Sequence, residues 1–154
     1  ADTPPSGGGV QSPRNDGGSS GVGHSGAITA LIPFECSAGS FVLSSSLDGD
    51  VKVWDSTNGE CKSTTNHGIG VVCMAISSDK NENPILLCGT ESGKIMVRML
   101  LKEMRLLASL DMNYINVGHS GPVKQIKAGP GNTFYSVGSD GNFVIWQIMA
   151  SLDS

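Results

Sequence analysis

A tetrapeptide recurs in this chain and sets the spacing of everything around it. Gly-His-Ser-Gly occupies residues 23–26 and again residues 118–121. An Asp-Gly pair follows each copy, and a tryptophan stands six residues after each of these aspartates, at Trp54 and Trp146. The tryptophans lie 92 residues apart, or two periods of about 46, a spacing typical of stacked copies of one supersecondary unit. Such a unit cannot bury its own apolar faces, so it needs neighbours of its own kind.

Short apolar runs and tight turns alternate between these landmarks, as they do in antiparallel sheets. Asp48-Gly49 and Asn58-Gly59 predict hairpin turns in the first repeat. The predicted fold class is all-β, with about three four-stranded antiparallel units at residues 23–66, 67–117 and 118–148. The expected strands are 27–34, 41–46, 51–54 and 60–65, then 71–77, 85–89 and 94–99, then 123–127, 134–137 and 143–148. Too few residues follow to give the third unit an outer strand.

Two segments need separate treatment. Residues 1–22 are rich in Gly, Ser and Pro, which favours a flexible linker or tail. Residues 100–111 place apolar side chains at helical spacing, but the repeat context favours an outer strand at 105–110. Both structures remain open for this segment on the sequence alone.

Composition excludes several classes of partner. The formal net charge is −4 and aromatic residues make up 5%, so we expect no direct binding of a nucleic-acid backbone. Lys52, Lys124 and Lys127 are expected to be solvated strand positions. We also expect no membrane span, because no apolar run approaches 18 residues. The first residues do not form a signal peptide, which points to the cytoplasm or the nucleus.

The cysteines and acidic residues do not form a recognisable reactive cluster. Cys36, Cys61, Cys73 and Cys88 lack the close pairing of a zinc site, so we interpret them as buried, reduced thiols. We interpret Asp79, Glu82 and Glu91 as surface loop residues. We therefore expect no metal ion and no cofactor.

With these residues and spacings the chain resembles the WD-repeat β-propellers, and the resemblance covers residues 24–147. It implies a partial, open propeller of three blades, each fastened by a buried chain of four side chains in which Asp accepts from His, His meets Ser, and Ser meets the Trp indole. The matching residues are His24, Ser44, Asp48 and Trp54 in the first blade, and His119, Ser136, Asp140 and Trp146 in the third.

The second repeat departs from this pattern. His67, Cys88, Ser92 and Arg98 stand at the corresponding positions, so the four-residue chain is lost there. One interpretation is a tolerated degenerate repeat. The other is that Arg98 is released for surface recognition, because arginine is enriched at interface hot spots.

A hydrolase was considered and set aside. His, Ser and Asp also form catalytic triads, but a nucleophile needs an exposed elbow and an oxyanion hole. The chain has no Gly-x-Ser-x-Gly elbow, and the trio occurs twice at matching positions. We therefore expect a structural role for these residues and no enzyme.

The resemblance implies a non-enzymatic scaffold that binds other proteins or peptides. The weak candidates for partner contact are Asp50, Asn66, Tyr114 and Asn116, together with Arg98 if it is free. Three segments (43–54, 84–88 and 126–131) also look like the C-terminal propeller of plant proteins that join CCCH zinc fingers to WD repeats. In that alternative, an association with RNA or DNA would belong to a part absent from this chain. Three blades do not close a ring, so we expect a fragment of a longer chain. In isolation we expect this fragment either to self-associate or to be partly disordered.

Overall fold

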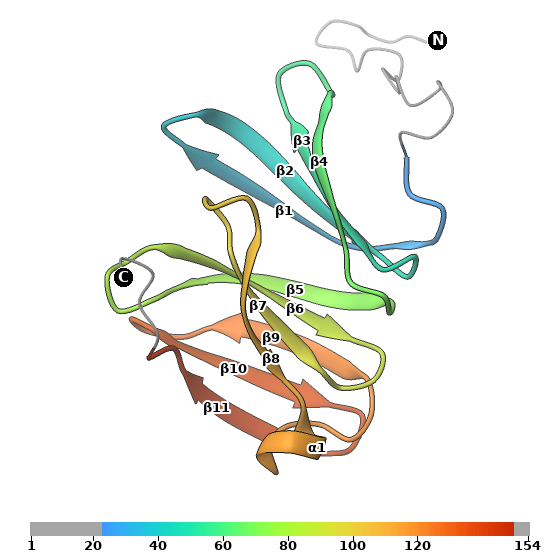
Figure 1. Cartoon of the computed structure of the whole chain (residues 1–154), viewed down its shortest axis with the longest axis vertical. Coiled ribbons are helices and arrows are strands. Elements are labelled where there is room, and N and C mark those ends of the chain that lie inside the picture. Colours follow the sequence, from blue (N-terminus) through green and yellow to red (C-terminus); the bar gives the residue numbers. More distant parts are fainter. Residues whose placement is uncertain (1–22, 150–154) are drawn as a thin grey trace, which may run out of the picture.

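The computed structural model describes residues 23–149; the predicted tail at residues 1–22 lies outside the described residues. Three antiparallel sheets follow one another along the chain and stack in that order (Figure 1). Sheet 1 contains β1 (Ile28–Cys36), β2 (Gly39–Ser46), β3 (Asp50–Asp55) and β4 (Cys61–Asn66); sheet 2 contains β5 (Val71–Ser78), β6 (Pro84–Thr90), β7 (Ile95–Met99) and β8 (Arg105–Leu110); sheet 3 contains β9 (Val123–Ala128), β10 (Thr133–Gly138) and β11 (Phe143–Gln147). A short helix, α1 (Met112–Ile115), joins sheets 2 and 3.

Every predicted strand is present, and the differences lie at the strand ends. β1 and β2 are longer than predicted because Cys36 pairs with Gly39, which leaves a two-residue turn. The segment that was open between helix and strand forms β8, which pairs with β7 from Leu110 opposite Ile95 to Arg105 opposite Met99. The segment forms a strand because its backbone pairs with β7, and this pairing outweighs the helical spacing of its apolar residues.

The turn between the second and third strands has the same backbone in all three sheets. Gly49, Gly93 and Gly141 have φ of 91°, 94° and 85°, a region that costs residues with a Cβ atom free energy. At Gly93 there is also no room, because a Cβ atom would clash with the carbonyl oxygen of His119. The sequence alignment of the three repeats at these glycines is therefore confirmed by the backbone.

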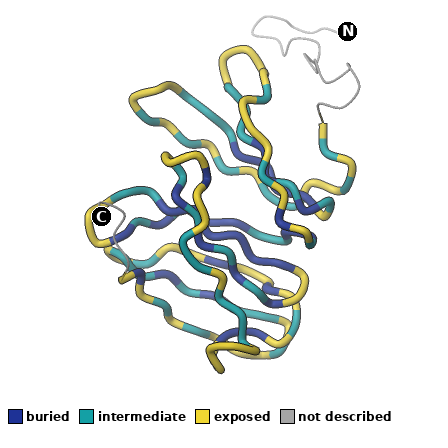
Figure 2. Tube along the Cα trace, viewed as in Figure 1, coloured by how far each residue is buried: buried dark blue, intermediate teal, exposed yellow. Residues whose placement is uncertain are grey.

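The apolar cores lie between the sheets. We call the face of a sheet that looks toward the next sheet in the sequence its front face, and the opposite face its rear face. Leu43 and Val51 of sheet 1 cluster with Val71, Met74 and Leu86 of sheet 2. Leu87, Ile95 and Val97 of sheet 2 cluster with Val123, Ile126 and Phe134 of sheet 3. Burial is accordingly greatest where sheets face one another, and the outer ends of the stack are exposed (Figure 2).

Within residues 23–149, no helix is both long and apolar enough to span a bilayer. The short α1 is the helix that joins sheets 2 and 3.

Truncation at the centre of the second core tests this arrangement. Leu87 is fully buried, so Leu87→Ala should lower the free energy of unfolding by about 2–5 kcal/mol through lost contacts and a residual cavity. Leu106 on β8 is 45% exposed, and Leu106→Ala should change it by less than about 1 kcal/mol. Urea unfolding followed by tryptophan fluorescence measures both, and equal effects would contradict the stacking.

Candidate interaction site and the relays that support it

The structure brings His24, Ser44, Asp48 and Trp54 together across three segments of sheet 1. His24 Nδ1 lies 3.2 Å from Asp48 Oδ2, and His24 Nε2 lies 2.6 Å from Ser44 Oγ. The Trp54 indole donates to the same Ser44 Oγ at 2.9 Å. A neutral imidazole with its proton on Nδ1 satisfies every partner, because Ser44 then accepts from Trp54 and donates to His24.

We call this hydrogen-bonded set of His, Ser, Asp and Trp side chains a relay. Sheet 3 repeats the relay with nearly the same distances. His119 Nδ1 lies 3.2 Å from Asp140 Oδ1 and His119 Nε2 lies 2.7 Å from Ser136 Oγ, which accepts from Trp146 at 2.8 Å. Ser44 and Ser136 are 2% and 1% exposed, and each hydroxyl is held between an indole and an imidazole. The geometry suits a fastening of neighbouring strands and leaves no open approach for a substrate to either hydroxyl.

The two turn aspartates are held as anions. Burial opposes ionisation of Asp48, but backbone N–H groups of Asp50 and Ser25 and the His24 ring together lower its pKa to about 2. Ser120 and Asn142 donate backbone N–H groups to Asp140 and, with His119, lower the pKa of that carboxyl to about 2 as well. Each carboxylate therefore closes its turn and orients its imidazole.

Sheet 2 has a different relay at the same positions. His67 Nδ1 donates to the Gly49 carbonyl of sheet 1 at 3.1 Å, and His67 Nε2 accepts from Arg98 Nε at 2.8 Å. Arg98 Nη1 donates to the Met104 carbonyl at 2.7 Å. The interpretation that Arg98 is released for surface recognition is wrong, because its guanidinium is engaged inside the molecule. Burial and the nearby Arg98 charge lower the pKa of His67, which favours the neutral ring that accepts this bond.

The cysteines lie in strands, but only one of them is fully buried. Burial raises the pKa of the Cys88 thiol to about 12 and that of Cys73 to about 11. Cys36 and Cys61 are half-buried, contrary to the expectation of four buried thiols. Among the described residues no group of three or more His, Cys, Asp or Glu side chains is placed to hold a metal ion.

Turns and inter-sheet loops gather on one side of the stack, which we call the loop face: residues 47–50, 66–70, 91–93, 111–122 and 139–142. The His67 amide donates to the Gly49 carbonyl at 2.8 Å, and the Glu91 amide donates to the Gly70 carbonyl at 3.0 Å. These bonds tie the turns to the segments that enter each sheet. The loop face is therefore a rigid surface built from several repeats.

The predicted contact residues on the loop face have different surroundings. Asn66 Nδ2 donates to Asp50 Oδ1 at 2.7 Å, so these two side chains stabilise their own turn. Tyr114 is 83% exposed on α1, which begins after the Asp111 cap and ends at Asn116 in the left-handed conformation with φ of 59°. Ile115 and Val117, which the sequence reasoning did not single out, are 42% and 47% exposed beside it.

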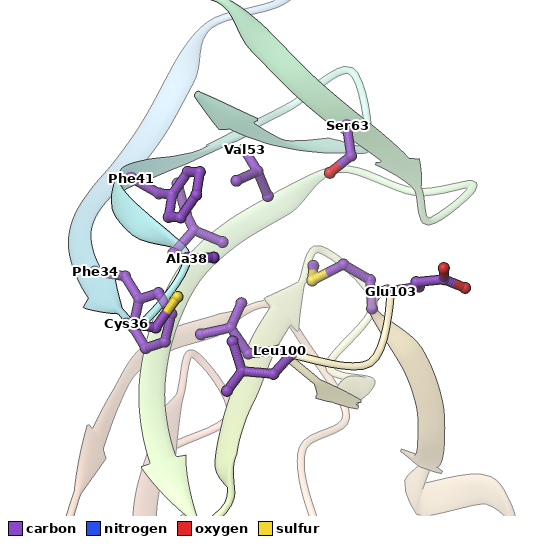
Figure 3. A pocket seen from close by; sticks show the side chains of 11 residues that line it. Phe34, Cys36, Ala38, Phe41, Val53, Ser63, Leu100 and Glu103 are labelled. Carbon is purple, nitrogen blue, oxygen red and sulfur yellow. The ribbon is translucent and has the colours of Figure 1, made fainter. Parts of the chain in front are cut away.

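An apolar cleft of about 210 Å³ lies between sheets 1 and 2 (Figure 3). Phe34, Phe41 and Val53 of sheet 1 face Leu100 and Met104 of the turn between β7 and β8 across it. Sequence reasoning missed the cleft because one wall comes from the strands of sheet 1 and the other from a turn about 40 or more residues later in the chain. It has room for an apolar side chain.

The turn at the mouth of this cleft has strained backbone. Glu103 and Met104 have φ of 57° and 59°, which costs residues with a Cβ atom about 1–2 kcal/mol each. The Arg105 amide closes the turn on the Lys102 carbonyl at 3.1 Å. Arg98 donates a hydrogen bond to the Met104 carbonyl, so the His67–Arg98 relay of sheet 2 also stabilises this turn.

Two further expectations about charged residues are wrong. Lys52 is 6% exposed, and its ammonium donates to Thr64 Oγ1 at 2.9 Å instead of lying in solvent. Asp79 is 2% exposed, because its carboxylate accepts from the backbone amides of Asn81 and Asn83 and closes the turn after β5. In both cases a local partner takes the place of water.

Acid should weaken the fold through Asp48 and Asp140. An aspartate in the unfolded chain has a pKa of about 3.9, whereas both folded values are about 2. As the pH falls from about 4 to about 2, the two carboxylates bind protons in the unfolded chain but stay ionised in the folded chain. The free energy of unfolding therefore falls. Urea titrations across this range should show a shallower fall for Asp48→Asn and Asp140→Asn than for the exposed control Glu35→Gln. An equal slope in all three variants would contradict the relay.

Loss of the Arg98 guanidinium should destabilise the fold. Arg98→Met leaves His67 Nε2 and the Met104 carbonyl without this donor, at an expected cost of about 1–3 kcal/mol in free energy of unfolding. Arg105→Met is the matched control, since Arg105 is exposed. Thermal unfolding followed by circular dichroism compares the two, and an unchanged midpoint for Arg98→Met would show that the internal bonds contribute nothing.

Comparison with known proteins shows a match between this chain and one protein family. The family described as "WD domain, G-beta repeat" matches residues 18–55 and 112–147, the two regions that hold the histidine-to-tryptophan relays. A search of curated protein sequences finds no match.

Solved structures share the fold. U3-55K (19% identical, TM-score 0.65) and the WD40 repeats of RRP9 (20% identical, TM-score 0.66) each align with 82% of this chain and 37% of their own. Ika8, a computationally designed protein, is 28% identical with a TM-score of 0.62 over 82% of this chain and 35% of its own. This chain thus spans little more than a third of each of these structures. With two matched repeats, their relays and three stacked antiparallel sheets, the chain belongs to the WD-repeat β-propeller family.

Proposed function

We propose that this chain is a non-enzymatic scaffold that binds other proteins through its loop face. The observation that carries the proposal is the exposed apolar group on and beside α1, formed by Tyr114, Ile115 and Val117. Large apolar side chains held on a rigid surface are typical anchors of protein interfaces. WD-repeat domains generally mediate protein–protein interaction, which supports the same role.

The way α1 is built favours a preformed contact. The Asp111 side chain caps the helix by accepting from the Asn113 amide at 2.9 Å, and the Asn116 amide closes the other end on the Met112 carbonyl at 3.0 Å. Asn142 Nδ2 donates to the Gly118 carbonyl at 3.3 Å, which joins the end of this loop to the turn of sheet 3. A loop held in one conformation loses little entropy when a partner binds.

A protein partner fits the charges better than a nucleic acid does. The chain carries a formal net charge of −4, and the ammonium of Lys52 is engaged by Thr64. Lys124 and Lys127 are exposed but are two isolated charges on β9. A backbone-binding surface would need a continuous basic stripe.

Removal of the exposed apolar side chains on and beside α1 should weaken partner binding. In a crosslinking capture from cell extract with quantitative mass spectrometry, Tyr114→Ser combined with Ile115→Ser and Val117→Ser should reduce the captured partners about tenfold or more, because a hot-spot truncation costs about 2 kcal/mol. The matched control is Leu106→Ser, which removes an exposed leucine away from the loop face. Equal capture by both variants would remove α1 as the contact.

A further inference from the structure

The apolar cleft between sheets 1 and 2 lies at the end of the strands away from the loop face (Figure 3). β1 begins near the loop face, where Ile28 pairs with Ser46, and ends at the cleft, where Cys36 pairs with Gly39. One wall is the front face of sheet 1, and the other is the turn at residues 100–104 between β7 and β8. Both walls therefore belong to consecutive sheets inside the stack, and neither end of the stack contributes to the cleft.

The corresponding place between sheets 2 and 3 is closed. Strand register makes three front-face residues of sheet 1 equivalent to three of sheet 2: Phe41 to Ile85, Val53 to Val97, and Asp55 to Met99. The three residues of sheet 2 are 0%, 5% and 2% exposed, whereas those of sheet 1 are half-buried. Asp55 contributes to this difference, because a carboxylate cannot be covered by apolar neighbours as Met99 is. The cleft is thus a local feature of the junction between sheets 1 and 2.

Two carboxylates flank the mouth of the cleft. Asp55 lies on β3 directly opposite the cleft residue Phe41. The hydroxyl and the amide of Thr57 lower the pKa of Asp55, which keeps this carboxyl ionised. Glu103 is exposed and lines the cleft from the turn at the other wall, where Figure 3 shows its carboxylate at the rim. Each wall therefore places one negative charge beside the apolar interior.

The neighbouring lysines do not cancel these charges. Lys62 acts on Asp55 through its charge, but its ammonium lies 3.4 Å from Glu60 Oε1, so these two side chains form an exposed ion pair of their own. Lys102 stands beside Glu103 in the turn, but it is not among the residues that line the cleft. The rim of the cleft therefore carries an excess of negative charge.

The dimensions of the cleft suit one side chain of another protein. Its volume is about 210 Å³, whereas pockets for small molecules and cofactors usually enclose roughly 300–1,000 Å³. Apart from Ser63, Glu103 and the Cys36 thiol, the residues that line the cleft are apolar. The interior therefore accepts an apolar group, and the acidic rim meets whatever lies on either side of that group.

The wall formed by the turn is ordered before any partner binds. Glu103 and Met104 are in the left-handed region, with φ of 57° and 59°, and Arg98 Nη1 donates to the Met104 carbonyl at 2.7 Å. Strained backbone of this kind persists only where the surroundings hold it, and it is concentrated at active sites and ligand clamps. A wall that is already ordered lowers the entropy cost of binding.

We propose that this cleft binds a basic, apolar peptide segment of a partner protein. A leucine or aromatic side chain of that segment occupies the cleft between Phe41 and Leu100, and a lysine or arginine beside it faces Asp55 or Glu103. Burial of the apolar side chain supplies affinity, and the opposite charges select basic segments over acidic ones. The contact goes beyond the proposed function, because it uses the opposite end of the strands from the loop face.

Heteronuclear NMR with short peptides tests the proposal on the isotope-labelled full chain. The probe is acetyl-Gly-Lys-Leu-Lys-Gly-amide, which should shift the backbone amides of residues 34–41 and 100–104 and leave those of residues 112–117 unchanged. Replacement of the leucine of the peptide by alanine should weaken binding about tenfold or more, because it removes buried apolar surface. Replacement of both lysines by glutamate should weaken binding about fivefold or more, because attraction at the rim becomes repulsion.

Three variants of the chain locate the contact. Glu103→Lys should weaken binding of the basic peptide about threefold or more. The matched control is Glu82→Lys, which changes an exposed glutamate of another turn that is also in the left-handed region, with φ of 66°, and it should bind like the wild type. Ala38→Phe places a ring in the cleft and should abolish the shifts. Circular dichroism spectra and melting curves establish that each variant is folded.

The cleft also contains a chemical reporter of its own occupancy. Cys36 lines the cleft, whereas Cys61 of the same sheet is half-buried but does not line it. In alkylation by iodoacetamide followed by mass spectrometry, the basic leucine peptide should slow the modification of Cys36 in proportion to occupancy and leave that of Cys61 unchanged. An unchanged rate at Cys36 would contradict binding in the cleft.

Several other results would overturn the proposal. The absence of shifts at the cleft with the peptide at about 10 mM would refute it, as would equal binding of the leucine and alanine peptides or of the basic and acidic peptides. Hexanol that shifts the cleft residues as strongly as the peptide would indicate a free alkyl ligand instead. Shifts at the cleft that depend on protein concentration without peptide would indicate a second copy. The triple serine variant of α1 should bind the peptide normally, so failure of this contact and failure of the loop-face proposal are told apart.

Discussion

Each sheet of this protein has apolar residues on both faces, and burial of those faces against other sheets is the constraint on which the rest of the structure depends. A single four-stranded sheet cannot bury its own two faces. It gains the free energy of burying apolar surface only when other sheets pack against it. The two core clusters lie between sheets 1 and 2 and between sheets 2 and 3. The stability of each sheet is therefore shared with its neighbours, and the ends of the stack carry unburied apolar surface.

The polar relays complement this packing because they act inside a sheet. His24 and His119 each join the start of a repeat to a serine on the second strand and an aspartate at the turn. These bonds hold the inner three strands in register and leave the flat faces to the apolar contacts. In sheet 2 the equivalent histidine instead bonds to the previous sheet, since His67 donates to the Gly49 carbonyl. A lost relay has thus been replaced by a link between two sheets.

Arg98 shows how one substitution alters several local features. It stands where tryptophan stands in the other repeats, and it bonds both His67 and the Met104 carbonyl. The second bond holds the strained turn at 103–104 that forms one wall of the cleft between sheets 1 and 2. Sequence alignment located Arg98 correctly, but its internal partners could not be predicted, because they lie on a loop and on another repeat.

The sequence by itself determined the strands, the turns and the relay residues, because each depends on local spacing that recurs with the repeat. The sequence predicted β8 only through the repeat context, because the spacing of the apolar residues in this segment is also compatible with a helix. The tertiary structure decided which chemically similar residues are buried, so Ile95 is covered and Phe143 is exposed at the same register position. It also decided that Lys52 and Asp79 are buried and that a cleft forms between sheets. Burial depends on which surface lies opposite a residue, and local sequence does not specify that surface.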